Sequence, residues 1–264
     1  SNGYRFAFWS GSIPPTSMTN NPLAVTMDQA RTLTASFSAV GGSPLDEGLV
    51  LYYSFNTNST PVADESGSGH TGTVRYATWT PGGVAGGAYS FAGITNDIRV
   101  TGWQPTVGNH SLGVSFWVKS THNYSGAEAG LVSWGFPTGS LGSWCGIIVG
   151  GYDTTNTTVY FNNGGSGTLT SRTTINDGNW HHVTVSYDNS LNSVVIYIDG
   201  VSKTNRSITM NVTGGSTNFM IGAENHNGLA VFDGALDEVR IYDRALAADE
   251  VTALYTLASG PTAR

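Results

Sequence analysis

The stretch VTVSYDNSLNSVVIYIDG, residues 183–200, decides the fold class of this chain. Apolar side chains recur at every second position in 183–187 and again in 194–198, so each run has one apolar face when it is extended. The segments DNS at 188–190 and DG at 199–200 have the residues that hairpin turns favour. The stretch therefore predicts antiparallel strands joined by tight turns.

Segments on both sides of this stretch extend the pattern. The runs 114–118 and 239–241 each mark one apolar face, and similar short runs alternate with clusters of Gly, Asn, Asp and Ser. Many strands at this spacing indicate a sandwich or barrel rather than βαβ units. A helical pattern runs from Leu246 to Leu257, and Asp243 is available as its cap. We expect an all-β protein with one short C-terminal helix.

The N-terminal region has a separate β pattern. Apolar and small residues alternate in 23–27 and in 33–37, and the polar segment 28–31 lies between them, which predicts a hairpin. Together with residues 3–11, this region resembles the C-terminal part of an internalin-type B-repeat, a small β module of bacterial surface proteins. Because a lone hairpin is marginally stable, we expect it to dock on the main domain or to be a truncated repeat.

Composition restricts the class of partner. Charged residues make up 11 % of the 264 residues, and the surface is rich in uncharged polar residues, which suits an extracellular protein that contacts neutral sugars. The net charge of −7 argues against nucleic acid. No stretch approaches the roughly 20 apolar residues of a membrane span. No signal peptide opens the sequence, so we expect any targeting segment to have been removed or to lie upstream. Cys145 has no second cysteine to pair with.

Three parts of the sequence carry a family likeness beyond the B-repeat. Taken together and in order, they resemble the laminin-G-like jelly roll of the concanavalin-A-like lectin/glucanase superfamily. They are GLVLYYSF (48–55) with DESGSGHTG (64–72), GNWHHV (178–183) with IYIDG (196–200), and FDGALDEVRIYDRAL (232–246).

This resemblance implies a two-sheet antiparallel jelly-roll β-sandwich with a curved front sheet. We expect residues 1–40 to be a B-repeat-like β appendage, 41–48 a linker, 49–258 the jelly roll and 259–264 a tail. The superfamily contains lectins, carbohydrate-binding modules, adhesion modules and some glycosidases, so the fold alone does not settle the activity.

Calcium is the cofactor that the resemblance implies, because many relatives use it to pin the start of the chain to its end. The Gly-rich segment 64–69 offers side-chain and carbonyl oxygens of the kind that calcium prefers. Asp237 lies in the motif where relatives supply a second carboxylate. The expected ligands are Asp64, Ser66, Gly69 and Asp237. The alternative is that Asp64 caps a turn by accepting bonds from its own backbone.

Catalytic signatures are missing from the sequence. Retaining hydrolases of this superfamily carry Glu-x-Asp-x-x-Glu on one strand, which puts alternate carboxylates on one face. No Glu in this chain has Asp two positions later, and the adjacent Asp237 and Glu238 would face opposite ways on a strand. Cys145 lies in an apolar run, where a buried, inert thiol is expected. His181 shares a face with Val183, which favours a core histidine over a catalytic one.

Sugar binding needs an aromatic platform and polar side chains that bond hydroxyl groups. Candidate residues lie in two loop-rich regions and on the expected front surface. They are His122, Tyr124, Glu128, Trp134, Phe136 and Trp144; Glu224, Asn225, His226 and Asn227; and Tyr152, Asp153 and Asn162. The alternatives are that Trp134 and Trp144 are core residues and that 224–227 is an ordinary solvated loop.

The sequence therefore favours a non-catalytic, lectin-like carbohydrate-binding module of a larger secreted or cell-surface bacterial protein. Two other classes stay open. One is an adhesion or spacer module that binds a host or cell-surface protein. The other is a polysaccharide-cleaving glycosidase or lyase with an atypical site.

Overall fold

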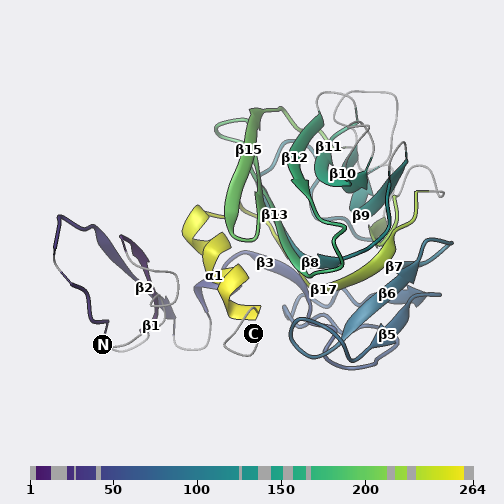
Figure 1. Cartoon of the computed structure of the whole chain (residues 1–264), viewed down its shortest axis with the longest axis horizontal. Coiled ribbons are helices and arrows are strands. Elements are labelled where there is room, and N and C mark those ends of the chain that lie inside the picture. The colour runs from purple at the N-terminus through teal and green to yellow at the C-terminus, as the bar shows by residue number, and fades with distance from the viewer. Residues whose placement is uncertain are drawn as a thin grey trace.

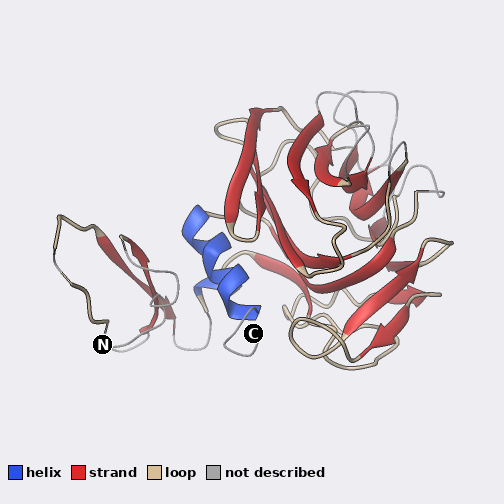
Figure 2. Ribbon diagram, in the orientation of Figure 1, coloured by secondary structure: helices blue, strands red, loops and turns tan. Residues whose placement is uncertain are grey.

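The computed structural model describes residues 4–12, 23–26, 28–39, 43–124, 127–135, 144–150, 157–164, 168–212, 218–224 and 230–258. Within these residues the chain forms antiparallel sheets, one α-helix and one short 3-10 helix. Figures 1 and 2 show two sheets packed into a sandwich, with the helix at one side. The predicted all-β jelly-roll sandwich with a short C-terminal helix is confirmed.

One layer of the sandwich is a sheet that we call the front sheet. Every neighbouring pair in it is antiparallel. Its strand order is β12 (Thr168–Thr174), β11 (Thr158–Asn162), β10 (Trp144–Gly150), β9 (Glu128–Gly135), β16 (Asn218–Ile221), β7 (Asp97–Thr101) and β4 (Thr73–Arg75).

The second layer is the back sheet, which is also antiparallel throughout. Its order is β15 (Val201–Ser207), β14 (Ser193–Ile198), β13 (His181–Asp188), β8 (Leu112–Lys119), β17 (Asp233–Tyr242), β6 (Ala88–Ala92) and β5 (Thr78–Thr80), and β3 (Leu49–Tyr53) also pairs with β17.

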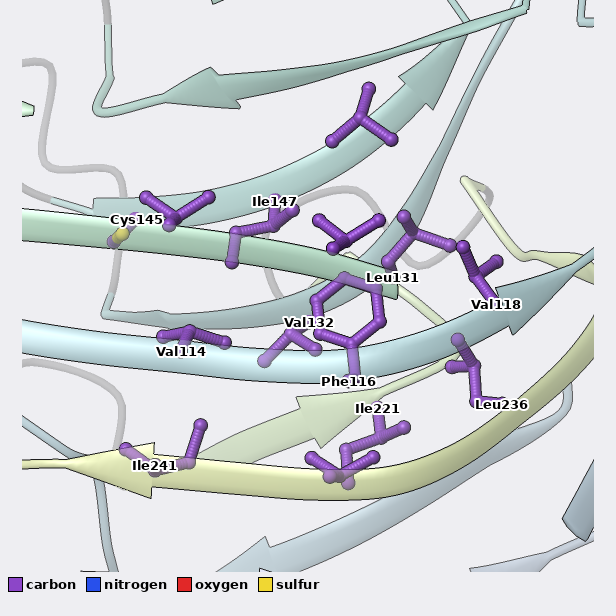
Figure 3. Packing of buried hydrophobic residues seen from close by; sticks show 14 of the residues in the cluster. Val114, Phe116, Val118, Leu131, Val132, Cys145, Ile147, Ile221, Leu236 and Ile241 are labelled. Atoms are coloured by element: carbon purple, nitrogen blue, oxygen red, sulfur yellow. The ribbon is translucent and has the colours of Figure 1, made fainter. Parts of the chain in front are cut away.

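The core lies between the two sheets and follows the period of two. On β8, Val114, Phe116 and Val118 are fully buried and face the front sheet (Figure 3). The ring of Phe116 lies close to Leu131 and Val132 of β9 in the same view. Full burial of a Phe side chain stabilises a fold by about 2–3 kcal/mol, so the alternation read from the sequence is a direct source of stability.

The stretch 183–200 forms the predicted antiparallel strands. Val183 of β13 pairs with Ile198 of β14. At the next turn Asp199 has φ 53° and Gly200 φ 75°, the two positive values of a type I′ turn. Asp188 Oδ1 accepts a hydrogen bond of 2.8 Å from Ser190 N and so closes the turn between β13 and β14. Turn chemistry and strand period therefore agree.

The C-terminal helix α1 (Ala248–Ala258) starts later than predicted. Asp243 is not its cap, because four residues lie between it and the first helical residue, and its backbone N–H donates to Gly48 O. Glu250 Oε2 accepts from Ala247 N at 2.9 Å at the start of the helix. No helix among the described residues is both long and apolar enough to cross a membrane.

The expected linker contains a structured segment. The 3-10 helix η2 (Pro44–Asp46) is capped by Ser43, whose Oγ accepts from Leu45 N at 3.2 Å. Leu45 packs in a small apolar cluster with α1 and the outer side of the back sheet. Part of the 41–48 segment is therefore anchored to the jelly roll. The expected tail, 259–264, lies outside the described residues.

The N-terminal hairpin differs from the one predicted. Strand β2 (Leu33–Ala39) pairs with β1 (Tyr4–Gly11), and residues 23–26 form no strand. The partner of β2 is instead the distant segment β1. Arg31, just before β2, donates from Nε to Thr26 O and from Nη1 to Ser12 O, both at 3.0 Å. Figure 1 places this hairpin apart from the sandwich, beyond α1.

Candidate functional site

The outer face of the front sheet carries side chains that point away from the core. On β10, Cys145 and Ile147 belong to the main core, whereas Trp144 and Ile148 form a separate buried cluster with Tyr160 of β11. Residues on one strand alternate between faces, so this second cluster lies on the opposite side of the sheet. The outer face of the front sheet therefore has an apolar cluster of its own, formed by Trp144, Ile148 and Tyr160.

Two carboxyl groups, those of Glu128 and Glu224, lie near this apolar cluster. Glu128 begins β9, and Tyr160 Oη donates a hydrogen bond of 2.5 Å to Glu128 Oε2. Glu224 follows β16 by three residues, and its backbone N donates to Ala230 O at 3.1 Å. At Gly130, a Cβ would lie 2.4 Å from Glu224 N, so only glycine lets this segment lie against β9. Glu128, Trp144, Ile148, Tyr160 and Glu224 are called the front-face cluster below.

The electrostatics of Glu224 set it apart from an ordinary surface carboxylate. Glu224 is only 1 % exposed. Burial, and to a smaller extent the nearby negative charge of Glu128, raise the pKa of Glu224 to about 8. At neutral pH, Glu224 is therefore largely a neutral acid that can donate a hydrogen bond. A buried carboxyl group with a raised pKa beside a second carboxyl group is a candidate functional site.

Two aromatic residues that were predicted to bind sugar, Trp134 and Tyr124, are buried, so this part of the prediction is wrong. Trp134 is 0 % exposed and faces the main core, where its ring lies 6.2 Å from that of Phe219. Tyr124 is also buried, and its hydroxyl accepts a hydrogen bond of 2.6 Å from Asp233 N. Both side chains hold the sandwich together and cannot stack on a ligand at the surface. The sequence pattern did not separate these roles, because a core aromatic and a platform look alike.

The other residues that were predicted to bind sugar differ in their exposure and position. His122 is exposed, and its Nδ1 lies 3.3 Å from Asp233 Oδ2. Trp144 lies on the outer face, but it is nearly covered. Asn162 is half-buried on β11, and its pairing partner Gly146 places it on the outer face. Tyr152, Asp153, Phe136, Asn225, His226 and Asn227 lie outside the described residues.

Tyr160 was missed by the sequence reasoning, although a signal was present. In the run TVYFN, Val159 and Phe161 belong to the core, so the residue between them must face outward. A large aromatic residue at an outward position is the pattern that could have identified it.

The carboxylates of the predicted calcium site accept hydrogen bonds from backbone N–H groups. Asp64 Oδ1 accepts from Tyr52 N and Ser66 N, both at 3.0 Å, and its Oδ2 accepts from His70 N at 2.9 Å. These backbone bonds lower the pKa of Asp64 despite its partial burial. This arrangement is the turn cap that the sequence left open as the alternative. Ser66 Oγ likewise accepts from Ser68 N at 3.2 Å, and Gly69 has a φ of 83° in the same turn.

Asp237 is used in the same way elsewhere. It is fully buried, and its oxygens accept from Val84 N (2.8 Å), Ala85 N (3.3 Å) and Glu238 N (2.8 Å). Burial and the charge of Glu238 together raise the pKa of Asp237 to about 7, although the backbone hydrogen bonds oppose the rise. Among the described residues, no three His, Cys, Asp or Glu side chains are grouped to hold a metal. Backbone amides already bind the oxygens of Asp64 and Asp237, and calcium binding stays a prediction.

The histidine pair and the cysteine are structural. His182, not His181, is the core histidine: its Nε2 lies 2.8 Å from Ser115 Oγ, both residues are buried, and burial lowers the pKa of His182 to about 3. His181 is half-buried between Asp199 Oδ2 (2.9 Å) and Asp177 Oδ1 (3.2 Å). Cys145 is buried, and burial raises the pKa of its thiol, as predicted for an inert residue.

Comparison with known protein families shows which family the chain belongs to. The profile of the concanavalin A-like lectin/glucanases superfamily matches residues 92–252. The chain belongs to this superfamily. A divergent InlB B-repeat domain matches residues 1–41, the region of the N-terminal hairpin. No curated protein matches the sequence.

Solved structures of the concanavalin A-like type include a close match in length. Domain 4 of AbnA, a GH43 extracellular arabinanase from Geobacillus stearothermophilus, was solved in complex with arabinotriose. This chain is 26 % identical to it, with a TM-score of 0.62, and the match covers 79 % of this chain and 98 % of domain 4.

Two toxin structures share the fold at lower identity. They are the binding domain of Paraclostridial Mosquitocidal Protein 1 (20 % identity, TM-score 0.63, 80 % of this chain covered) and that of botulinum neurotoxin serotype D/C (16 %, 0.59 and 81 %). The chain spans 52 % and 53 % of the lengths of these domains.

Proposed function

We propose that this concanavalin A-like domain is a non-catalytic carbohydrate-binding module and that glycans bind on the outer face of the front sheet. The observation that carries the proposal is the similarity to domain 4 of the arabinanase. That domain was solved with arabinotriose, and the match extends over 98 % of its length. The low charge content of the chain, 11 %, agrees with a neutral ligand.

The front-face cluster supplies the polar chemistry that a sugar requires. Glu128 is half-buried and can accept a hydrogen bond from a sugar hydroxyl through the oxygen that Tyr160 does not bind. The Asn162 side chain lies on the same face, half-buried, and adds an amide. Such a mixture of donors and acceptors matches sugar hydroxyls, which act as both.

The proposed setting is a larger secreted or cell-surface bacterial protein. The arabinanase that contains domain 4 is extracellular, and the match at residues 1–41 is to a repeat domain. A binding module in such a protein would hold other parts of the protein near a polysaccharide.

The test is a glycan array that is probed with the whole chain and with two variants. Glu128→Gln removes the acceptor charge at the cluster, and Glu47→Gln changes an exposed carboxylate in the segment before β3. The proposal predicts binding to at least one neutral glycan, about tenfold weaker for Glu128→Gln and unchanged for Glu47→Gln. An array without any bound glycan, while a protein partner is captured, would replace the proposal with the adhesion function.

One observation favours a second candidate, glycan hydrolysis. Glu128 and Glu224 interact electrostatically, and the raised pKa of Glu224 is what a general acid at neutral pH needs. Incubation of the glycans that bind with the chain, followed by measurement of reducing ends, separates the two functions. Release of reducing ends that is lost in both Glu128→Gln and Glu224→Gln would establish the hydrolase.

A further inference from the structure

A second polar and aromatic surface lies at the rim of the sandwich, at residues that the sequence analysis did not single out. The chain passes from the front sheet to the back sheet between β4 and β5, and it returns between β6 and β7. Figure 1 shows β5, β6 and β7 together at one side of the sandwich. Tyr76 lies in the first crossing and is 78 % exposed, and Ile94 lies in the second and is 69 % exposed.

These exposed side chains are held in place by a buried amide. Asn96 is 4 % exposed, and its Nδ2 donates to Tyr76 O at 2.5 Å. Its Oδ1 accepts from Ile94 N at 3.2 Å and from Ala92 N at 3.3 Å. Tyr76 has a φ of 58°, which is costly for an aromatic residue. The surrounding bonds therefore fix an unfavourable backbone that keeps the Tyr76 ring exposed.

Two arginines and one aspartate lie beside this segment: Arg75 precedes Tyr76 in the chain, and Asp97, which follows Asn96, pairs with Arg75 across β4 and β7. Asp97 Oδ2 lies 3.3 Å from Arg75 Nη1 and 3.5 Å from Arg99 Nη2. The Arg75 and Arg99 side chains are 37 % and 27 % exposed, whereas that of Asp97 is 6 % exposed. One carboxylate serves two guanidinium groups through long contacts, so N–H donors are left over for a ligand. Arg75, Tyr76, Ile94, Asp97 and Arg99 are called the rim site.

We propose that the rim site is a second glycan subsite, in which the Tyr76 ring takes the C–H face of a sugar and the arginines take its hydroxyl groups. An aromatic face beside fixed N–H donors is the chemistry of sugar recognition. A protein partner is a poorer fit, because two exposed apolar side chains are far from the roughly 1,000 Å² that a specific protein interface buries.

The rim site and the front-face cluster lie on one continuous sheet, and the inference rests on the proposed function. Arg75 pairs with Asp97 across β4 and β7, and β16 connects β7 to β9, where Glu128 lies. Three strand spacings separate β4 from β9, which is about 14 Å. The ligand class is therefore an extended polysaccharide that contacts both places, not a single terminal sugar.

The experiment is affinity electrophoresis of the whole chain in gels that contain arabinan, xylan, galactan, mannan or mixed-linkage β-glucan. Four variants are compared: Tyr76→Ala, Tyr76→Phe, Glu128→Gln and, as a matched control, Leu191→Ala, an exposed apolar residue in the turn between β13 and β14. For the polysaccharide that retards the wild type, we expect Tyr76→Ala to weaken binding about tenfold. Tyr76→Phe keeps the ring and should stay within about twofold, and Leu191→Ala should match the wild type.

The outcomes separate this inference from the proposed function. Retardation that Glu128→Gln weakens and Tyr76→Ala leaves unchanged would remove the rim subsite alone. A wild type that no polysaccharide retards would remove both. Equal losses in Tyr76→Phe and Tyr76→Ala would exclude the ring as the platform. Because the Tyr76 side chain is 78 % exposed, unfolding temperatures should stay equal among the Tyr76 variants, which excludes misfolding.

Discussion

The buried acid Glu224 predicts how the stability of this protein depends on pH. The folded chain keeps the proton of Glu224 up to a pKa of about 8, whereas an ordinary Glu releases it near 4.5. Between these values the folded state binds more protons than the unfolded state, so the free energy of unfolding falls as pH rises. Each unit of pKa difference corresponds to roughly 1.4 kcal/mol, which gives a loss of about 4 kcal/mol by pH 8.

Glu224→Gln removes this titration and keeps the shape of the side chain. Urea unfolding of the wild type and the variant at pH 5, 6, 7 and 8 measures the effect. The stability of the variant relative to the wild type should rise steadily across this window, by up to about 4 kcal/mol. Glu47→Gln is the matched control, because the Glu47 side chain is exposed in the segment before β3. A stability difference for Glu224→Gln that is the same at all four pH values would refute the reasoning.

Three further predictions concern the turns and the metal. The hydrogen bond to Asp199 raises the pKa of His181, so this pair stabilises the fold at low pH, and its contribution is lost as pH rises through the folded pKa. Asp199→Asn should therefore lower the free energy of unfolding more at pH 5.5 than at pH 9. Equal losses at the two pH values in urea titrations would contradict this. Asp64→Ala should cost about 2 kcal/mol, since three backbone N–H groups lose their acceptor; an unchanged urea midpoint would show that the cap is dispensable. Because the Asp64 and Asp237 oxygens are already bonded to amides, a chelator should leave the unfolding temperature of the wild type unchanged; a fall that added calcium reverses would restore the predicted ion site.

Much of the fold was predictable, because strand period and turn chemistry are local properties. The alternation in 183–187 and 194–198 and the turn at 199–200 correspond to β13, β14 and a type I′ turn. The prediction of the N-terminal hairpin was wrong because β2 pairs with β1, a partner that is distant in the sequence. Arg31 contacts Ser12, 19 residues away, and no pattern within 23–37 contains that contact.

The candidate site was predicted only in part, for a related reason. Glu128 and Glu224 were chosen from separate loops, and only the antiparallel pairing of β9 and β16 brings them near each other. Burial explains the failures: Trp134 and Trp144 have the same composition signal, yet they lie on opposite faces of the front sheet. Tyr76 gave no sequence signal, because its exposure depends on a buried amide 20 positions away.

The claim that glycans bind on the outer face of the front sheet is tested most directly by mapping amide chemical shifts in an isotope-labelled chain. Arabinotriose is the first probe, followed by a soluble oligosaccharide of the class that the array selects. We expect the shifts that change on titration to gather on β9, β10 and β11 and around Glu224. Spectra that no sugar alters, or changes confined to the back sheet, would contradict the account.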